Sequence, residues 1–118
     1  MPTLDLREFI RDIPDFPRPG ILFRDITPLL LNAGALDAAV SDLAERVAAA
    51  QVDFVVAAEA RGFILGAALA RELGAGFVPA RKPGKLPAET ISAEYTLEYG
   101  IDALEVHADA LAHGARVL

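Results

Sequence analysis

The feature that most constrains the fold is a strand–helix–strand pattern over residues 53–80. It opens with an apolar run over 53–58, continues as an Ala- and Leu-rich helical pattern up to Leu73, and closes with a second apolar run over 77–80. Gly74 stands where a helix commonly ends. Continuous apolar runs are typical of parallel strands that are covered on both faces. We therefore predict an α/β fold, an open parallel sheet flanked by helices, with a right-handed crossover in this unit.

Hydrophobic periodicity and turn residues predict further elements on both sides of this unit. Toward the N-terminus we expect a helix over 5–13, a turn-rich connector over 14–20, a short strand over 21–23, a break at 32–35 and a helix over 36–51. Toward the C-terminus we expect a strand over 91–99, its partner over 103–107, one helical turn over 109–112 and a last strand over 115–118.

Composition excludes several classes of protein. The chain has 118 residues and is 53% hydrophobic, which is enough for one domain with one core and excludes a wholly disordered chain. Its net charge of −6 argues against a surface that coats nucleic acid, and its apolar runs are too short to span a bilayer. The absence of cysteine excludes disulfides and thiolate chemistry. We expect a cytoplasmic protein with no nucleic-acid or membrane partner.

The junction between the first strand and the helix carries Glu59, Ala60, Arg61 and Gly62. In open α/β sheets, ligands bind at the carboxyl ends of strands, and the first N–H groups of a helix favour an anion. Arg61 can grip a phosphate bidentately, while Gly62 allows close backbone approach. Glu59 can orient Arg61, bond a sugar hydroxyl or lie near a metal. An ordinary loop with a solvated arginine is an equally good interpretation.

A basic loop follows the second strand and contains Arg81, Lys82 and Lys85. If the two strands are neighbours, this loop lies near the Glu59 junction, and its bases complete a phosphate or pyrophosphate site. Prolines and a glycine suggest a loop of defined shape that closes over a ligand. The alternative is a solvated charge run, which is the more common case but is weakened here because the chain is acidic overall.

Two further segments carry candidate residues. Glu98 falls on the polar face of the predicted strand over 91–99, where it is either a general acid or base or simply exposed. Tyr95 and Tyr99 share the apolar face, which favours a core position. In the N-terminal segment FPRPGILFRDITP, Phe23 offers a face for stacking, worth about 1–3 kcal/mol per base. The alternatives for that segment are an arm packed over the core and a subunit contact.

Taken together, three segments resemble the adenine phosphoribosyltransferase family. They are DFPRPGILFRDITPLL, EARGFILGAALARELG, and RKPGKLP followed by YTLEYG; EVHADAL adds to the match. The resemblance runs from about Ile10 to Leu118. Members of this family join adenine to phosphoribosyl pyrophosphate (PRPP), giving AMP and pyrophosphate, with Mg²⁺. The resemblance implies the type I phosphoribosyltransferase fold, with an N-terminal hood for the base.

The resemblance also implies roles for individual residues. Phe23 would stack on adenine, and the backbone at Leu22 and Arg24 would bind the edge of the base. The implied pyrophosphate site has six members: Glu59, Ala60, Arg61, Arg81, Lys82 and Lys85. Arg61 and Glu98 are the implied catalytic residues, with Tyr99 beside Glu98 in a flap over about 82–100. No residue of the chain is assigned as a metal ligand.

The resemblance further implies a single incomplete phosphoribosyltransferase domain over 1–118, with an arm and hood over 1–34 and a core over 35–118. In the family, a strand like ARVL leads into a loop that grips the ribose 5-phosphate. This chain ends before that loop, so the resemblance implies either a fragment or a chain whose missing part comes from elsewhere. A homodimer is also implied.

Two other functions stay open at this point. A non-catalytic nucleotide-binding or dimerising module of the same fold would lack the PRPP loop. An enzyme of the same class could instead take hypoxanthine or xanthine, although the segment around Phe23 favours adenine.

Overall fold

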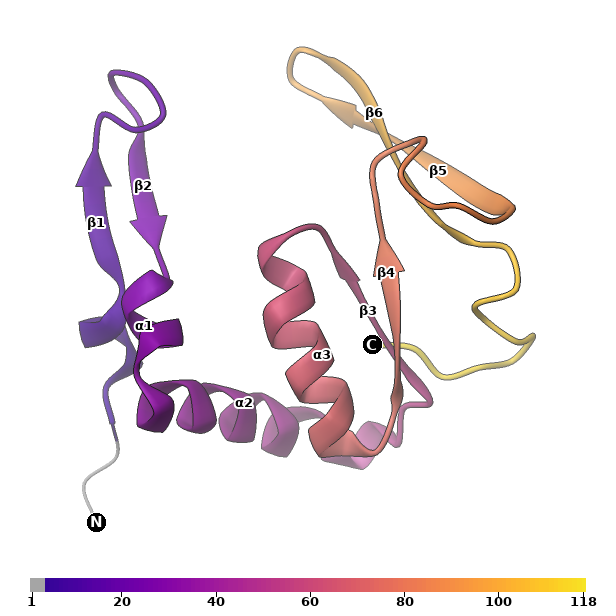
Figure 1. Ribbon diagram of the computed structural model, residues 1–118, viewed down its shortest axis with the longest axis horizontal. Coiled ribbons are helices and arrows are strands. Elements are labelled where there is room, and N and C mark those ends of the chain that lie inside the picture. The colour runs from indigo at the N-terminus through magenta and orange to yellow at the C-terminus, as the bar shows by residue number, and fades with distance from the viewer. Residues whose placement is uncertain (1–3) are drawn as a thin grey trace. The chain divides into compact units, whose positions relative to one another are not determined.

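The computed structural model describes residues 4–118 (Figure 1). Its backbone divides after Leu43 into two units, and each is described by itself. No helix within the described residues has the length and apolar character needed to cross a membrane.

The first unit is built from short elements. These are a 3₁₀ helix η1 (Leu6–Phe9), strands β1 (Arg11–Pro14) and β2 (Leu22–Asp25), and helix α1 (Thr27–Leu31), followed by helix α2 (Ala33–Val47), which continues into the second unit. Strands β1 and β2 pair antiparallel, from Arg11 opposite Asp25 to Pro14 opposite Leu22. The short strand expected over 21–23 is therefore present, one residue further along and longer.

The helix predicted over 5–13 is wrong beyond its first turn. Asp5 does cap the start, since its side chain accepts a hydrogen bond from the Arg7 N–H at 3.1 Å. The helix ends at Phe9, and residues 11–14 form a strand instead. Two cross-strand ion pairs, Arg11–Asp25 and Arg24–Asp12, each at 2.8 Å, accompany this pairing. An isolated helix of so few residues is marginal, so tertiary pairing prevails over the local pattern.

A small core lies between the helices of the first unit. Leu29, Ala35 and Ala39 are buried, and partly buried apolar side chains pack against them: Leu6, Phe9, Leu30 and Leu36. The break expected over 32–35 is limited to Asn32, because α2 already begins at Ala33. The Asn32 side chain accepts a hydrogen bond from the Ala35 N–H at 2.9 Å, as an N-cap does.

A parallel sheet organises the second unit. Strand β3 (Phe54–Ala58) pairs in parallel with β4 (Gly76–Ala80), and helix α3 (Arg61–Leu73) connects them. On its other side β3 pairs with the segment 116–118, through a parallel bridge between Phe54 and Val117. The strand–helix–strand unit is thus confirmed, whereas the strand expected over 115–118 is reduced to a single bridge at Val117. Toward the start of this unit α2 gives way to a 3₁₀ turn, η2 (Ala48–Ala50).

Helix α3 packs directly on the sheet. Val55, Leu69 and Ala70 are buried together, and Phe77 packs against them. Gly66 makes the close approach possible, since a Cβ added there would lie 2.8 Å from the Ala57 Cβ and 2.8 Å from a Phe77 ring carbon. The helix ends at Gly74, whose φ of 70° is left-handed, as the sequence predicts.

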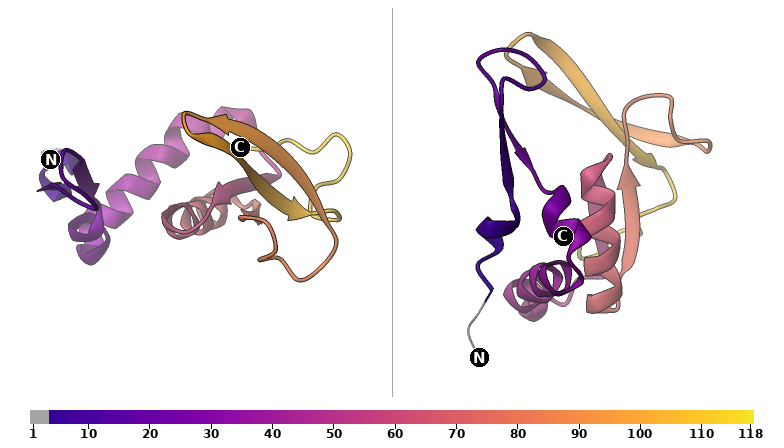
Figure 2. Two further views of the ribbon diagram at one scale, coloured as in Figure 1. Left: turned by 90° about the horizontal axis from the view of Figure 1, so that it is seen from above. Right: turned by 60° about the vertical axis from the view of Figure 1, so that its left-hand side comes forward.

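A long hairpin follows β4 (Figure 2). Strands β5 (Thr90–Leu97) and β6 (Gly100–His107) pair antiparallel, with Leu97 opposite Gly100. The turn is therefore Glu98–Tyr99 and not residues 100–102 as expected. A bridge between Arg81 and Glu105 joins the hairpin to the end of β4. The helical turn expected over 109–112 does not form; that segment consists of turns and bends.

Candidate functional site

Glu59 follows the carboxyl end of β3, and its side chain binds the basic loop that follows β4. Its Oε1 accepts hydrogen bonds from the Arg81 Nε at 3.2 Å and from the Lys82 backbone N–H at 2.8 Å. Its Oε2 accepts one from the Lys85 Nζ at 2.8 Å. The prediction that the two loops are neighbours is therefore confirmed, and the physical link between them is one carboxylate.

The electrostatics of Glu59 follow from these contacts. The hydrogen bonds from the Lys85 ammonium and from the Lys82 N–H lower the pKa of Glu59 to about 2, from an ordinary value of 4.5. The side chain is only 15% exposed. Glu59 is therefore a carboxylate at neutral pH, and it gathers positive charge instead of binding a phosphate itself.

Lys82 directs its side chain away from Glu59 and toward the hairpin. Its Nζ donates hydrogen bonds to the Asp102 Oδ2 and, at 3.2 Å, to the Tyr95 hydroxyl. It also lies 5.9 Å from the centre of the Tyr95 ring. The Asp102 hydrogen bond raises the pKa of Lys82, and the same bond lowers the pKa of Asp102. An ammonium is thus neutralised within the chain.

Asp102 was missed by sequence reasoning. Residues directly opposite on an antiparallel pair share a face, and Tyr95 pairs with Asp102. A correct placement of the turn at Glu98–Tyr99 would have revealed this pair, whereas a turn at residues 100–102 hides it.

Glu105 holds the far side of the basic loop. Its backbone exchanges two hydrogen bonds with Arg81, at 2.9 and 2.7 Å. Its side chain accepts hydrogen bonds from the Gly84 N–H at 3.0 Å and from the Thr90 hydroxyl at 3.3 Å. The loop between β4 and β5 is therefore contacted by carboxylates from three places: the end of β3 and two positions on β6.

Arg61 and Gly62 begin helix α3, as expected. Ala60 precedes the helix, and its side chain makes no cap hydrogen bond. A Cβ on Gly62 would lie 3.3 Å from the Ala57 Cβ, which shows how closely the helix start approaches β3. Such an uncapped N-terminus is suited to an anion.

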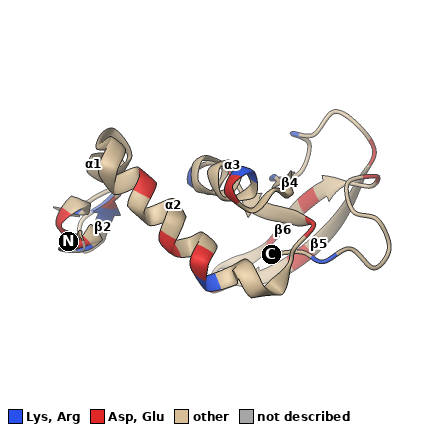
Figure 3. Cartoon of the chain, turned by 90° about the horizontal axis from the view of Figure 1, so that it is seen from below, with Lys and Arg blue, Asp and Glu red and all other residues tan. Residues whose placement is uncertain are grey.

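Positive charge at these loops contrasts with the rest of the chain. Figure 3 shows acidic residues spaced along α2, at Asp37, Asp42 and Glu45. The chain as a whole carries a net charge of −6. The four bases of these two neighbouring segments are therefore a local concentration of basic groups, and Arg81, Lys82 and Lys85 are paired with carboxylates of the chain.

The candidate base-binding residues Leu22, Phe23 and Arg24 lie on β2, in the first unit. The rings of Phe16 and Phe23 meet edge-to-face, with centres 5.2 Å apart. The Arg24 side chain pairs with Asp12 at 2.8 Å, across the β1–β2 pair.

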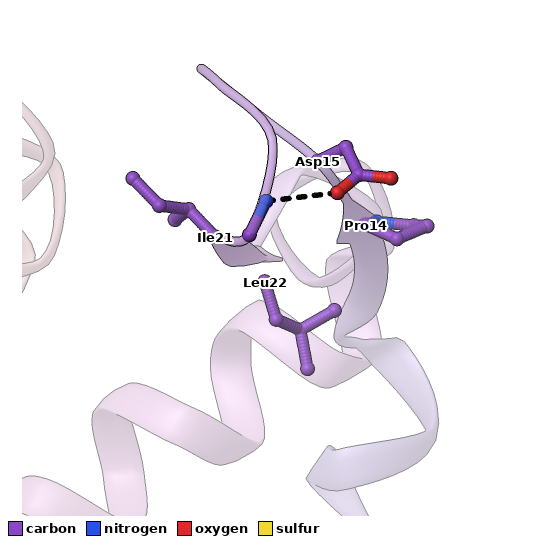
Figure 4. Close-up of a pocket in the computed structure, with 5 residues that line it drawn as sticks. Pro14, Asp15, Ile21 and Leu22 are labelled. Carbon is purple, nitrogen blue, oxygen red and sulfur yellow. Dashed lines mark hydrogen bonds between the residues drawn. The ribbon is translucent and has the colours of Figure 1, made fainter.

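A small pocket lies beside these residues, in the turn between β1 and β2 (Figure 4). It has a volume of about 180 Å³ and is lined by Pro14, Asp15, Gly20, Ile21 and Leu22. The Asp15 Oδ1 accepts a hydrogen bond from the Gly20 N–H at 2.9 Å, which closes the turn.

Glu98 and Tyr99 form the tip of the β5–β6 hairpin. The sequence placed Glu98 on a strand face and Tyr99 on an apolar face that favours a core position; both placements are wrong, because these residues make the turn. Tyr99 is 94% exposed, whereas Tyr95, on the strand, is 36% exposed. A turn frees side chains from the alternation that a strand imposes.

A metal centre is not formed by the part of the chain that the structure describes. Within residues 4–118 no group of three or more His, Cys, Asp and Glu side chains is placed to hold a metal ion. Glu59, the acid at the junction, is engaged by three basic-loop residues.

Comparison with known proteins decides the family. No family model matches the chain. The adenine phosphoribosyltransferase of Herpetosiphon aurantiacus, however, is 60% identical over 116 residues, which cover 98% of this chain and 67% of that relative. The chain belongs to the adenine phosphoribosyltransferase family. The resemblance seen in the sequence is thereby confirmed.

Solved structures of adenine phosphoribosyltransferases share the fold. The enzyme from Thermoanaerobacter pseudethanolicus superposes with a TM-score of 0.91 at 55% identity, covering 96% of this chain and 66% of that one. The enzyme from Saccharomyces cerevisiae, in complex with an imino-altritol bisphosphate and adenine, gives a TM-score of 0.89 at 38% identity, with the same coverage. The predicted type I phosphoribosyltransferase fold is confirmed. The chain spans about two thirds of the length of these relatives.

Proposed function

We propose that the protein transfers the phosphoribosyl group of PRPP to adenine and so serves purine salvage. A bond forms between a ring nitrogen of adenine and the ribose carbon, the bond from that carbon to pyrophosphate breaks, and the ring nitrogen loses its proton. The products are AMP and pyrophosphate. The observation that supports this function best is the set of bases that Glu59 gathers at the carboxyl ends of β3 and β4.

The leaving pyrophosphate is the group for which this site is suited. Arg61, at the start of α3, and the basic loop offer positive charge where negative charge develops as the bond breaks. The proposed ligands are the backbone at Ala60 and the side chains of Arg61, Arg81, Lys82 and Lys85. Glu59 positions the loop that carries three of them.

The binding site for adenine is assigned to the first unit. Phe23 supplies a ring face for stacking, and the backbone at Leu22 and Arg24 supplies polar groups for the edge of adenine. The yeast relative, 38% identical, was solved with adenine bound, which supports a base site in this family.

Glu98 is proposed as the residue that takes part in proton transfer at the purine. Its place in a hairpin turn, with Tyr99 beside it, suits a flap that covers the reacting groups. Exclusion of water matters here because water would otherwise hydrolyse the activated sugar.

Mg²⁺ enters this proposal with the substrate. Since the described residues form no three-ligand metal cluster, we propose that the ion arrives bound to the phosphates of PRPP and neutralises part of their charge. We further propose that the protein is cytoplasmic and acts as a homodimer.

Incubation of the protein with labelled adenine, PRPP and Mg²⁺ tests the function. Labelled AMP is expected, with hypoxanthine as the control base giving far less product. Efficient use of hypoxanthine would contradict the base assignment. Binding of pyrophosphate without any AMP formation would instead favour the non-catalytic module.

A further inference from the structure

The Lys82 side chain, a proposed pyrophosphate ligand, has its partners on the β5–β6 hairpin and not at Glu59. Its backbone N–H is held by Glu59, but its ammonium is bound by Asp102 and the Tyr95 hydroxyl on the hairpin. The Lys82 ammonium, which could bind an anionic ligand, is thus already paired with the Asp102 carboxylate of the same chain.

We propose that Asp102 is a positioning residue that holds the Lys82 ammonium on the hairpin, and that Lys82 leaves Asp102 for the anion when pyrophosphate binds. This proposal rests on the proposed function, since it requires a pyrophosphate ligand at the Glu59 junction.

The geometry allows the exchange. The Lys82 backbone stays beside Glu59 because its N–H bond to that carboxylate does not involve the side chain. A lysine ammonium sits on a flexible four-carbon stem with freely rotating donors, so it can turn from the hairpin to the junction while its Cα stays in place.

The energetics also allow it. The Lys82 side chain is 42% exposed and that of Asp102 is 28% exposed. Ion pairs with this much exposure contribute little to stability, so a polyanion of higher charge competes well for the ammonium. The contacts of the Lys82 Nζ with the Tyr95 hydroxyl and ring are lost in the same movement.

Asp102 differs in this respect from Glu59. Glu59 holds a backbone N–H and two side chains, and therefore fixes the shape of the loop. Asp102 accepts from the Lys82 ammonium of the loop and from the neighbouring Ala103 N–H, and a hydrogen bond with the Tyr95 side chain on β5 also lowers its pKa. Loss of the Asp102 charge is therefore expected to release Lys82 without dismantling the loop.

Calorimetric titration with inorganic pyrophosphate tests the exchange. Asp102→Asn is expected to lower the Kd for pyrophosphate roughly three- to tenfold, because Lys82 no longer has a competing carboxylate. Lys82→Met is expected to raise the Kd, and adding Asp102→Asn to it is expected to have no further effect. Asp109→Asn, at an exposed turn of the same unit, is the matched control for loss of one negative charge and is expected to leave the Kd nearly unchanged.

A second readout keeps Asp102 intact. The chain has no tryptophan and two tyrosines. In a Tyr99→Phe background, tyrosine fluorescence therefore comes from Tyr95 alone. Pyrophosphate is expected to change Tyr95 fluorescence, and Lys82→Met is expected to abolish the change.

The possible failures are distinguishable. If the wild-type protein binds pyrophosphate but Asp102→Asn leaves the Kd unchanged or raises it, or if binding leaves Tyr95 fluorescence unaltered, the exchange is overturned. If the wild-type protein binds no pyrophosphate at all, the proposed function fails, and the exchange fails with it.

Discussion

At the scale of single residues, Glu59 binds the basic loop and so determines where its positive groups lie. One carboxylate of low exposure accepts hydrogen bonds from three positions of the basic loop, and this is why its pKa falls to about 2. Sequence reasoning placed Glu59 at the junction correctly, and the bases of the next loop were expected nearby. It did not reveal which of them Glu59 contacts, because side-chain pairing across a sheet edge depends on loop shape.

The pKa of Glu59 predicts how stability depends on pH. A folded-state pKa of about 2, below the ordinary 4.5, means that the ionised group stabilises the folded chain above pH 4.5 and loses this contribution as the pH falls toward 2. The difference in unfolding free energy between the wild-type protein and Glu59→Gln is therefore expected to shrink over that range in denaturant titrations. Glu72→Gln, on the exposed side of α3, is the matched control. A difference that is constant over that range would contradict the assignment.

Arg61 is expected to serve pyrophosphate and not adenine. Charge-assisted hydrogen bonds contribute about 1.5–3 kcal/mol, so Arg61→Ala should raise the Kd for pyrophosphate about 10- to 100-fold. Calorimetry is expected to show adenine binding unchanged. Arg71→Ala, in the last turn of the same helix, controls for loss of charge. Equal losses for both ligands would remove the role assigned to Arg61.

Phe23 is expected to contribute to the binding of adenine and not to that of PRPP. Stacking on an aromatic side chain is worth about 1–3 kcal/mol per base, so Phe23→Ala should raise the KM for adenine about tenfold or more with little change in the KM for PRPP. Phe16→Ala removes the edge-to-face contact with Phe23 but keeps the stacking ring, and it should have a smaller effect. An unaltered KM for adenine in Phe23→Ala would show that Phe23 does not stack on the base.

At the scale of elements, periodicity predicted long patterns well and short ones poorly. The unit β3–α3–β4 is confirmed because its apolar runs, its helical period and Gly74 all agree. The helix expected over 5–13 gives way to strand pairing, since cross-strand ion pairs and β2 are invisible in the local pattern. The hairpin turn was misplaced for a related reason: alternation continues through Glu98–Tyr99, and only the register shows where the chain reverses.

Gly66 is the residue on which the packing of α3 depends. A methyl group there would meet the Ala57 Cβ and a Phe77 ring carbon at 2.8 Å, which forces the helix or the ring to move. Gly66→Ala is therefore expected to lower the unfolding free energy by about 1–3 kcal/mol, measured by chemical denaturation. Gly34→Ala in α2 is the control, because its Cβ would meet only the Asn32 Oδ1, at 3.4 Å. It should be neutral or stabilising, and an unchanged stability of Gly66→Ala would show that the helix does not pack this closely.

At the scale of the whole molecule, the family was predictable because distinct segments matched in order, although each alone was weakly specific. The α/β fold and the family are confirmed. The roles of Arg61, Phe23 and Glu98, the association with Mg²⁺ and the homodimer stay predictions. Asp102 and Glu105 were not found from the sequence, because they contact the basic loop from a strand that is far along the chain.

The reverse reaction tests the central claim most directly, because it makes pyrophosphate a substrate whose concentration can be varied. The protein is incubated with AMP, inorganic pyrophosphate and Mg²⁺, and free adenine is measured. We predict adenine release that requires both AMP and pyrophosphate and saturates with each. Binding of AMP and pyrophosphate without release of adenine would contradict the proposed transferase activity.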